Sequence, residues 1–203
     1  YTPALNYIGG DLFVYEVCDN GLPPLCSNAV VLITVTAVND APTATTDSYS
    51  TNEDNVLFGS SVLANDFDQD GNSLSLTGVA ITPPLHGNLV LNANGTFIYT
   101  PFLNYNGTDS FVYEVCDNGV PSLCANALVN LTITPINDAP IAVADVATTA
   151  EDTPLSGTSV LTNDSDADGN PFTISTTPAV LPLHGTVTIN SNGTYLYTPT
   201  ANY

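Results

Sequence analysis

Two short acidic loops are the parts of this sequence best suited to chemistry. Each carries aspartates at alternate positions before a glycine: Asp66, Asp68 and Asp70 in the first loop, and Asp164, Asp166 and Asp168 in the second. Alternating carboxylates before a glycine allow a tight loop to turn several oxygen ligands onto one hard cation. An EF-hand would need a glutamate at the twelfth loop position, where Thr77 and Ser175 stand instead. The loops therefore predict calcium sites of another type, with solvated turns as the alternative.

The acidic loops belong to a longer sequence repeat. Tyr-Thr-Pro begins at Tyr1, Tyr99 and Tyr197, and Asn-Asp-Ala-Pro begins at Asn39 and Asn137, always at an offset of 98 residues. A solenoid unit is shorter than this, whereas an independent β-sandwich domain has about this size. The repeat predicts tandem domains.

The phase of the repeat divides the chain into three parts. We expect residues 1–38 to be the C-terminal part of one β-sandwich repeat, 39–136 to be a complete repeat, and 137–203 to be the N-terminal part of the next. We also expect the chain to be a window from a longer array.

Short stretches of alternating polarity predict the elements that must position the loops. Residues 110–116 alternate and place Phe111, Tyr113 and Val115 on one face of a strand, and residues 92–95 have the composition of a hairpin turn. Roughly seven such strands fit each repeat, and no segment keeps a helical period. The predicted fold class is all-β, with tandem Greek-key β-sandwich domains of cadherin or immunoglobulin type.

The charge of the chain excludes several classes of partner. It contains no Lys or Arg and 20 Asp and Glu residues, for a net charge of −20. Nucleic acid and anionic membrane surfaces are excluded as partners because both are bound through Lys or Arg. No apolar run is long enough to span a membrane. Clustered carboxylates without a protein cation favour a bound metal ion, with compositional drift in a secreted repeat as the alternative.

The four cysteines form one local pair in each repeat, Cys18 with Cys26 and Cys116 with Cys124. Even, local pairing in a short polar loop predicts disulfides and an oxidising compartment, and hence an extracellular or cell-surface location. A thiolate metal site is the alternative, although no histidine lies near either pair.

Nothing in the sequence has the pattern of an active site. His86 and His184 each stand in Leu-His-Gly, where we expect a hydrogen-bonded turn histidine rather than a catalytic base. There is no glycine-rich phosphate loop, no serine elbow and no Cys–His arrangement. The paired carboxylates recur in each repeat, as structural ions do. We therefore expect that the protein is not an enzyme.

Four motifs in fixed order resemble cadherin repeats, and still more the cadherin-like tandem repeats of large bacterial surface proteins. They are the linkers Asn39–Pro42 and Asn137–Pro140, the pairs Glu53-Asp54 and Glu151-Asp152, the two acidic loops, and the Asp-Asn-Gly-x-Pro hairpins that begin at Asp19 and Asp117. The cadherin Asp-Arg-Glu motif has no counterpart, with Asp109 and Asp11 only loosely nearby.

This resemblance implies that Ca²⁺ binds where repeats join. The implied ligands are Asp19, Asn39, Asp40, Glu53, Asp54, Asp66, Asp68, Asp70, Asp117, Asn137, Asp138, Glu151, Asp152, Asp164, Asp166 and Asp168. Strand direction in a sandwich predicts that Asp117 lies beside Asn39 and the first loop, and that Glu53 approaches Asp138 and the second loop. Calcium there would neutralise repulsion and stiffen the joint.

The sequence therefore favours a structural, calcium-stabilised segment of an extracellular stalk, fibre or filament. Its expected partners are neighbouring repeats of the same array and other copies of the chain in a fibre, and the sequence identifies no ligand at the tip. One alternative is an adhesin whose repeats bind a protein or glycan through an apolar patch that differs between repeats. Ile8, Leu12 and Phe102 are candidates for that patch, although we expect them to pack in the core. Another alternative is a filament subunit that polymerises by domain complementation.

Overall fold

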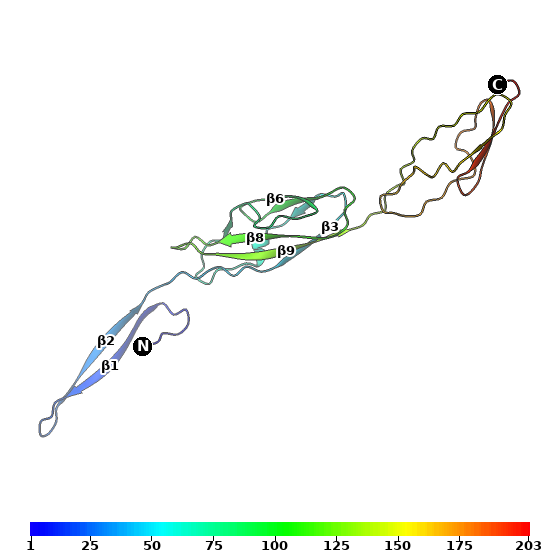
Figure 1. Cartoon of the computed structure of the whole chain (residues 1–203). Helices are drawn as coiled ribbons and strands as arrows, with labels where there is room; N and C mark the ends of the chain where they lie inside the picture. Colours follow the sequence, from blue (N-terminus) through cyan, green and yellow to red (C-terminus); the bar gives the residue numbers. More distant parts are fainter.

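The computed structural model describes all 203 residues as three parts arranged along one long axis (Figure 1). Strands β1 (Gly9–Cys18) and β2 (Cys26–Val35) form a hairpin at the N-terminal end. A seven-stranded unit follows, and a three-stranded part forms the C-terminal end. There is no α-helix, only a 3₁₀ turn, η1 (Val62–Asn65). The structure contains no helix that could span a membrane.

The middle unit is a sandwich of two sheets, here called the middle sandwich. Its strands are β3 (Asp47–Asn52), β4 (Leu57–Gly59), β5 (Ser75–Leu76), β6 (Gly87–Leu91), β7 (Phe97–Pro101), β8 (Gly107–Cys116) and β9 (Cys124–Thr134). One sheet has the order β3-β9-β8-β5 and the other β4-β7-β6. The first strand pairs in parallel with the last, and all other pairs are antiparallel. The predicted all-β, immunoglobulin-like sandwich is confirmed.

The core of the middle sandwich is built from alternate residues of facing strands. Phe111, Tyr113 and Val115 of β8 are fully buried, on the face that the alternating sequence predicted. Phe97 from the opposite sheet packs edge-on against Phe111, with ring centroids 5.3 Å apart. Burial of each such side chain contributes roughly 1.5–3 kcal/mol, so this strand pattern provides much of the driving force for folding.

Two stretches are less regular than simple alternation would suggest. The end of the apolar stretch from Val56 to Leu63 enters η1, where the Ser61 hydroxyl caps the turn by accepting from the Leu63 amide (3.2 Å). The stretch 74–81 contributes only the two-residue strand β5, because Gly78 takes a positive φ of 80° and interrupts the pairing with β8, which resumes where the Ile81 amide donates to the Val112 carbonyl (2.8 Å). Local backbone geometry interrupts the apolar pattern at both places.

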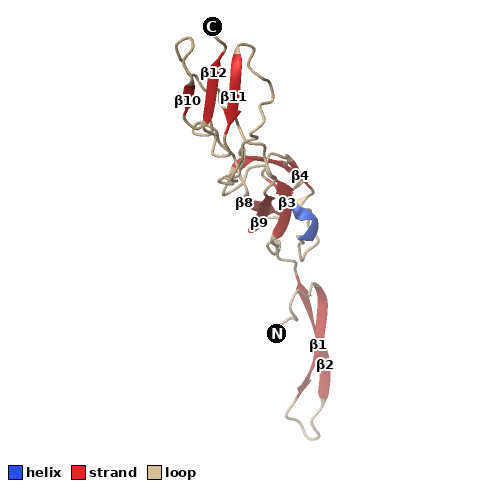
Figure 2. Ribbon diagram, turned by 90° about the vertical axis from the view of Figure 1, so that its right-hand side faces the viewer, coloured by secondary structure: helices blue, strands red, loops and turns tan.

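The terminal parts repeat pieces of the middle sandwich in their strand pairing; Figure 2 shows the hairpin β1–β2 at one end and strands β10, β12 and β11 side by side at the other. The hairpin β1–β2 has the same register as β8–β9, with Cys18 opposite Cys26 and Cys116 opposite Cys124. Both predicted disulfides are formed. Strands β10 (Leu155–Gly157), β12 (Tyr195–Pro199) and β11 (Gly185–Ile189) pair in the order β10-β12-β11, which repeats β4-β7-β6.

Candidate metal centres at the junctions

A backbone bridge holds each acidic loop against the linker that precedes it. In the middle sandwich, Thr43 and Phe67 exchange two backbone hydrogen bonds of 2.8 and 3.2 Å. Ile141 and Ser165 exchange the equivalent pair in the C-terminal part, at 2.7 and 3.0 Å. Each loop is therefore held at the start of its own repeat.

At the first junction, linker, loop and hairpin meet. The side-chain amide of Asn39 donates to Asp117 Oδ2 (2.7 Å), and its carbonyl oxygen accepts from the Asn72 side chain (2.6 Å). The backbone amide of Asp40 donates to Asp70 Oδ2 (2.7 Å). Asp117, which closes the hairpin after β8, is thus placed at the entry end of the middle sandwich.

Gly119 makes this close approach possible. A Cβ at position 119 would overlap the side-chain amide of Asn39, so any larger residue there would push the linker away from the hairpin. Asp117 Oδ1 holds the same turn by accepting from the backbone amides of Gly119 (3.0 Å) and Leu123 (2.9 Å). The Asp-Asn-Gly sequence therefore holds the hairpin turn and allows the linker to approach it closely.

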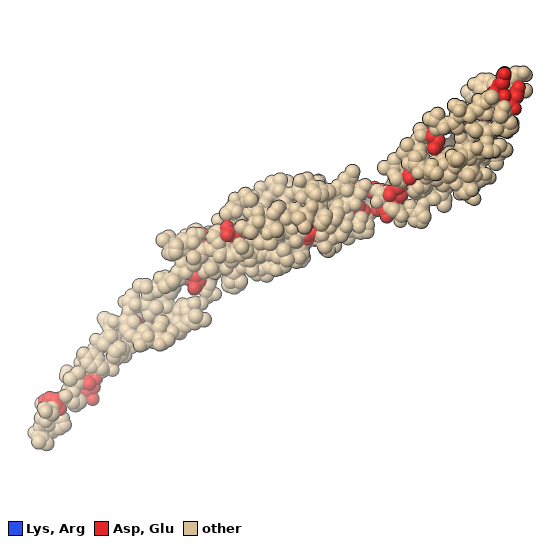
Figure 3. Space-filling model, in the orientation of Figure 1, with Lys and Arg blue, Asp and Glu red and all other residues tan.

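At the second junction, the exit end of the middle sandwich faces the second acidic loop. Glu53 is only 3% exposed and accepts from the backbone amide of Ile136 (2.5 Å) and from the Asn106 side chain (3.2 Å). The backbone amide of Asp138 donates to Asp168 Oδ2 (2.7 Å), which repeats the contact at the first junction. Figure 3 shows acidic side chains gathered where these two parts meet.

The carboxyl group of Asp138 is affected by this negative charge. Burial raises its pKa, and four neighbouring carboxylates raise it further. These neighbours are Asp168, Asp54, Glu53 and Asp166. No Lys or Arg exists in the chain to balance them. The junction therefore concentrates uncompensated carboxylates from both sides of the linker.

One carboxylate oxygen at each junction is buried and has no hydrogen-bond partner. Asp68 Oδ1 accepts from the backbone amides of Asp70 (2.9 Å) and Asn72 (3.1 Å), but its Oδ2 is unpartnered. Asp138 Oδ2 is unpartnered at the second junction. Buried charged oxygens are costly without a partner, so these two atoms fit a bound cation.

The junction carboxylates are nevertheless not drawn into a tight cluster. The groups whose possible ligand atoms lie within 4.8 Å of one another are Glu16 with Cys18 and Cys26, and Glu114 with Cys116 and Cys124. Their sulfur atoms are joined in disulfides and offer no thiolate, which removes the thiolate metal site considered above. The more open spacing at the junctions agrees with repulsion between like charges.

Other expected ligands lie in different surroundings. Asp66 points into the middle sandwich, where it accepts from the Thr45 amide (2.8 Å) and the Tyr113 hydroxyl (2.9 Å). Asp164 accepts from the Val143 amide (2.8 Å) in the same way. Asp66 and Asp164 are therefore less available to a cation at the linker than the other aspartates of their loops.

Three more expected ligands lie away from both junctions. Asp19 accepts from the backbone amides of Gly21 and Leu25, both at 3.0 Å, within the turn that closes the β1–β2 hairpin. Glu151 and Asp152 belong to the C-terminal part, where Asp152 accepts from the Asn202 amide (2.7 Å). Asn137 donates to the backbone carbonyl of Asp138 (3.0 Å) instead of reaching a hairpin aspartate.

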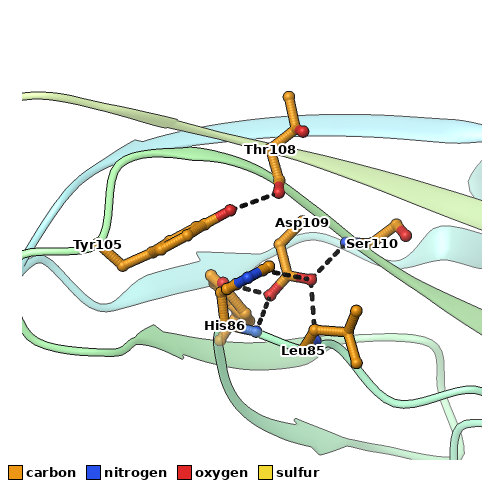
Figure 4. Close-up of polar contacts among 7 residues, drawn as sticks. Leu85, His86, Tyr105, Thr108, Asp109 and Ser110 are labelled. Atoms are coloured by element: carbon orange, nitrogen blue, oxygen red, sulfur yellow. Dashed lines mark hydrogen bonds and ion pairs between the residues drawn. The ribbon is translucent and has the colours of Figure 1, made fainter.

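Asp109 is an important polar residue whose role the sequence did not reveal (Figure 4). Its Oδ1 accepts from the backbone amides of Leu85 (3.0 Å) and Ser110 (2.9 Å). Its Oδ2 accepts from the His86 amide (2.9 Å) and the Tyr99 hydroxyl (2.8 Å). Burial alone would raise the pKa of Asp109, but these four hydrogen bonds hold it below its usual value. The signal that could have revealed it is the recurrence of Tyr-Thr-Pro at the same distance before Asp11 and before Asp109.

The histidine rings stack on tyrosines. The His86 ring lies on that of Tyr105, with centroids 4.1 Å apart, and His184 stacks on Tyr203 at 4.0 Å. The His86 Nδ1 atom has no hydrogen-bond partner and lies 3.8 Å from an oxygen of Asp109. The turn is hydrogen-bonded, as expected, and the bond is made by the His86 backbone amide, which donates to Asp109 Oδ2.

Comparison with known proteins supports the architecture. The model of the bacterial cadherin-like domain family matches residues 39–135, and that of the bacterial Ig domain family matches residues 137–203. The Fat-like cadherin-related tumor suppressor homolog of Drosophila melanogaster is 31% identical over 168 residues, which cover 78% of this chain and 4% of that protein. The chain thus spans a small fraction of the curated relative it matches.

A solved structure shares the fold. The protocadherin gamma B7 structure with extracellular cadherin domains 1–4 gives a TM-score of 0.53 at 19% identity, over 95% of this chain and 49% of that one. Cadherin-like domains are in general non-enzymatic extracellular repeats with adhesive or structural roles, and cadherin domains generally bind calcium. Residues 39–135 are therefore similar to a bacterial cadherin-like domain, and residues 137–203 to a bacterial Ig domain.

Proposed function

We propose that this chain is a structural, calcium-stabilised segment of an extracellular stalk or fibre, with repeat boundaries at Asn39 and Asn137. The observation that carries the proposal is the second junction. There Asp138 has an unpartnered Oδ2, four more carboxylates from both sides of the linker raise its pKa, and no protein cation compensates them. A hard divalent cation with oxygen ligands suits such a donor set.

The residues that would hold calcium divide between the two junctions. At the second they are Glu53, Asp54, Asp138, Asp166 and Asp168, and at the first Asn39, Asp40, Asp68, Asp70 and Asp117. Bound calcium supplies the positive charge that the chain lacks. The protein's part is to carry these ligands on a linker, a loop and the end of a sandwich, so that binding joins adjacent repeats.

The mechanical consequence follows from charge. Without a cation, clustered carboxylates repel one another, and a linker with few direct contacts allows adjacent domains to move. With calcium, the same groups attract a common partner and the joint stiffens. This role needs no catalytic group, and we propose that the segment is non-enzymatic.

Calcium titration of the 203-residue polypeptide tests the proposal. Small-angle scattering of the chromatographically separated monomer would report particle length, and thermal unfolding would report stability, in chelator and in calcium. We expect calcium to lengthen and stiffen the particle and to raise Tm. Ligand at 100 times its Kd stabilises the state that binds it by about 2.7 kcal/mol.

A matched pair of variants identifies the site. Asp138→Asn removes one charge at the second junction, and Glu16→Gln removes one charge from the exposed C-terminal half of β1. We expect Asp138→Asn to weaken the calcium response and Glu16→Gln to leave it unchanged. An identical response in both variants, or no response at millimolar calcium, would contradict the assignment.

One surface favours adhesion as a second candidate function. Phe58, Ile98 and Val90 lie side by side across β4, β7 and β6 on the outer face of the sheet, and Phe58 is 75% exposed. The equivalent positions in the next repeat are Ser156, Leu196 and Thr188, so the patch differs between repeats.

The surface candidates taken from the sequence behave differently from our expectation. The expected core packing of Ile8, Leu12 and Phe102 is wrong, because all three are exposed.

Replacement of Phe58 by Ser should abolish binding of the chain to cells or glycans if the patch of Phe58, Ile98 and Val90 is adhesive, without changing the calcium response. Unchanged binding would reject the adhesive role of the patch.

A further inference from the structure

The two disulfides lie on the outward faces of their hairpins. The middle disulfide (Cys116–Cys124) ends the pairing of β8 with β9, and the N-terminal disulfide (Cys18–Cys26) ends the pairing of β1 with β2. Val115 is fully buried, and successive side chains of a strand point to opposite faces, so the middle disulfide faces outward. Its Cys116 is half-buried and its Cys124 is exposed. A dissolved thiol therefore reaches this disulfide without unfolding of the middle sandwich.

A glutamate stands beside each disulfide, two residues before its first cysteine. A carboxylate oxygen of Glu114 lies within 4.8 Å of both sulfur atoms of the middle disulfide. Glu16 has the same relation to the N-terminal disulfide. The chain contains no Lys or Arg that could pair with either carboxylate. Each disulfide therefore has an uncompensated negative charge beside it.

This charge acts on the reaction by which disulfides are opened. Thiol–disulfide exchange begins when a thiolate anion attacks one sulfur of the disulfide. A carboxylate beside the sulfurs repels the approaching thiolate, and it repels more strongly a thiol that carries carboxylates of its own. An ammonium group close to the attacking sulfur is attracted instead.

We propose that Glu114 and Glu16 make the two disulfides charge-selective thiol-exchange sites, which react slowly with anionic thiols and more readily with small aminothiols. The class of reactant is set by charge, because the sulfurs themselves are accessible. The role is independent of calcium, since it needs only the hairpin and its glutamate. It would protect the crosslink of an extracellular repeat against acidic reductants.

The individual steps place the new charge next to Glu114. Attack at the more exposed Cys124 Sγ forms a bond between this atom and the incoming sulfur, breaks the bond to Cys116 and leaves the electron pair on Cys116 Sγ. A second small thiol then attacks the mixed disulfide, releases Cys124 and leaves as the oxidised dimer. The two small thiols are thereby oxidised, the protein disulfide is reduced, and the protons that the small thiols lose end on the two cysteines.

Coulomb's law gives the size of the effect. At the separation between Glu114 and the sulfurs, two unit charges in water change an exchange rate by about fourfold. The screening length is about 30 Å at 0.01 M salt and about 3 Å at 1 M salt. The selectivity should therefore be fully expressed at low salt and largely lost at high salt.

Reduction rates of the two disulfides in the same molecule test the proposal. The 203-residue polypeptide would be treated at neutral pH with glutathione, an anionic thiol, or with cysteamine, an aminothiol. Chelator would be present, so that the result does not depend on the calcium proposal. Thiols would be trapped with iodoacetamide, and the reduced fraction of each pair would be measured by peptide mass mapping.

Two isosteric variants serve as each other's control. Glu114→Gln should raise the rate with glutathione about fourfold at the middle disulfide and leave the N-terminal disulfide unchanged, and Glu16→Gln should do the reverse. Both variants have the same net charge, so only the position of the lost carboxylate differs. With cysteamine, the gain at the same disulfide should stay below about twofold, because loss of the attraction to its ammonium group offsets the loss of repulsion.

Three results would overturn the proposal. Equal acceleration of both disulfides by either change would show an effect of net charge alone. Equal gains with the two thiols, or no gain with glutathione, would show that the glutamates do not select by charge. An acceleration that persists at about 1 M salt would show that the change loosened the hairpin, because charge effects are screened there.

Discussion

Replacement of Asp109 by Asn is expected to destabilise the middle sandwich strongly. The carboxylate accepts four hydrogen bonds, from the amides of Leu85, Ser110 and His86 and from the Tyr99 hydroxyl. An Asn side chain keeps one acceptor oxygen and turns an NH₂ group toward the other two donors. An unsatisfied buried donor costs about 1–3 kcal/mol. The Tyr99 hydroxyl can rotate to another acceptor, whereas a backbone amide cannot. The expected loss in the free energy of unfolding is therefore about 2–4 kcal/mol.

Thermal unfolding followed by tyrosine absorbance measures this loss, because only the middle sandwich has a buried core. For a unit of this size, 1 kcal/mol shifts Tm by about 4–8 °C, so the variant should unfold at least ~8 °C lower. Asp11→Asn is the matched control: Asp11 is exposed and accepts only from Tyr1 and Leu12, so the expected change is under ~0.5 kcal/mol. Similar shifts in the two variants would refute the assignment of Asp109 as a buried anchor.

The contribution of Asp109 to the stability of the middle sandwich should also depend on pH. Because its pKa is lowered in the folded state, its contribution is present above the unfolded value of about 3.9 and is lost as pH falls through the lower folded value. The stability difference between the parent chain and Asp109→Asn should stay constant from about pH 7 to pH 5 and shrink below about pH 4. A difference that persists in strong acid would contradict a role of the charged carboxylate.

Two further changes test the hairpin at the first junction. Gly119→Ala should displace the Asn39 side chain and reduce the calcium response seen by scattering. Gly21→Ala, at the equivalent turn of the N-terminal hairpin, should leave the calcium response unchanged. Equal responses in the two variants would show that the close approach at Gly119 has no role. Replacement of both Cys116 and Cys124 by serine should lower the free energy of unfolding of the middle sandwich by about 2–3 kcal/mol, the value expected for a disulfide that closes a loop of this length. Urea unfolding measures this loss. An unchanged urea midpoint would show that the disulfide does not stabilise the folded sandwich.

The features that the sequence predicted correctly depend on local spacing. Alternation in residues 110–116 was sufficient to assign the buried face of β8, because successive side chains in a strand point to opposite sides. Cys116 and Cys124 could be paired because they are close in the chain and closed by a turn. The placement of Asp117 beside Asn39 followed from strand direction once a sandwich was assumed.

The surroundings of the individual acids depend on contacts between distant segments. Asp66 and Asp68 are two residues apart in one loop, yet Asp66 is engaged by the Tyr113 hydroxyl while Asp68 keeps a buried, unpartnered oxygen. Tyr113 comes from a strand 47 residues later, so no local pattern distinguishes the two carboxylates. Likewise, Asp109 becomes an anchor only when the turn at Leu85 is folded onto β8.

The sequence by itself thus determined the repeat, the strand pattern, the disulfides and the acidic composition, because each is encoded in period, alternation or short spacing. The tertiary structure alone decided which carboxylates face each other across the linker and which are satisfied inside the sandwich. The raised pKa of Asp138 shows the reason: charges from two sandwich ends and a loop meet there, and only the packing of those segments sets their separation.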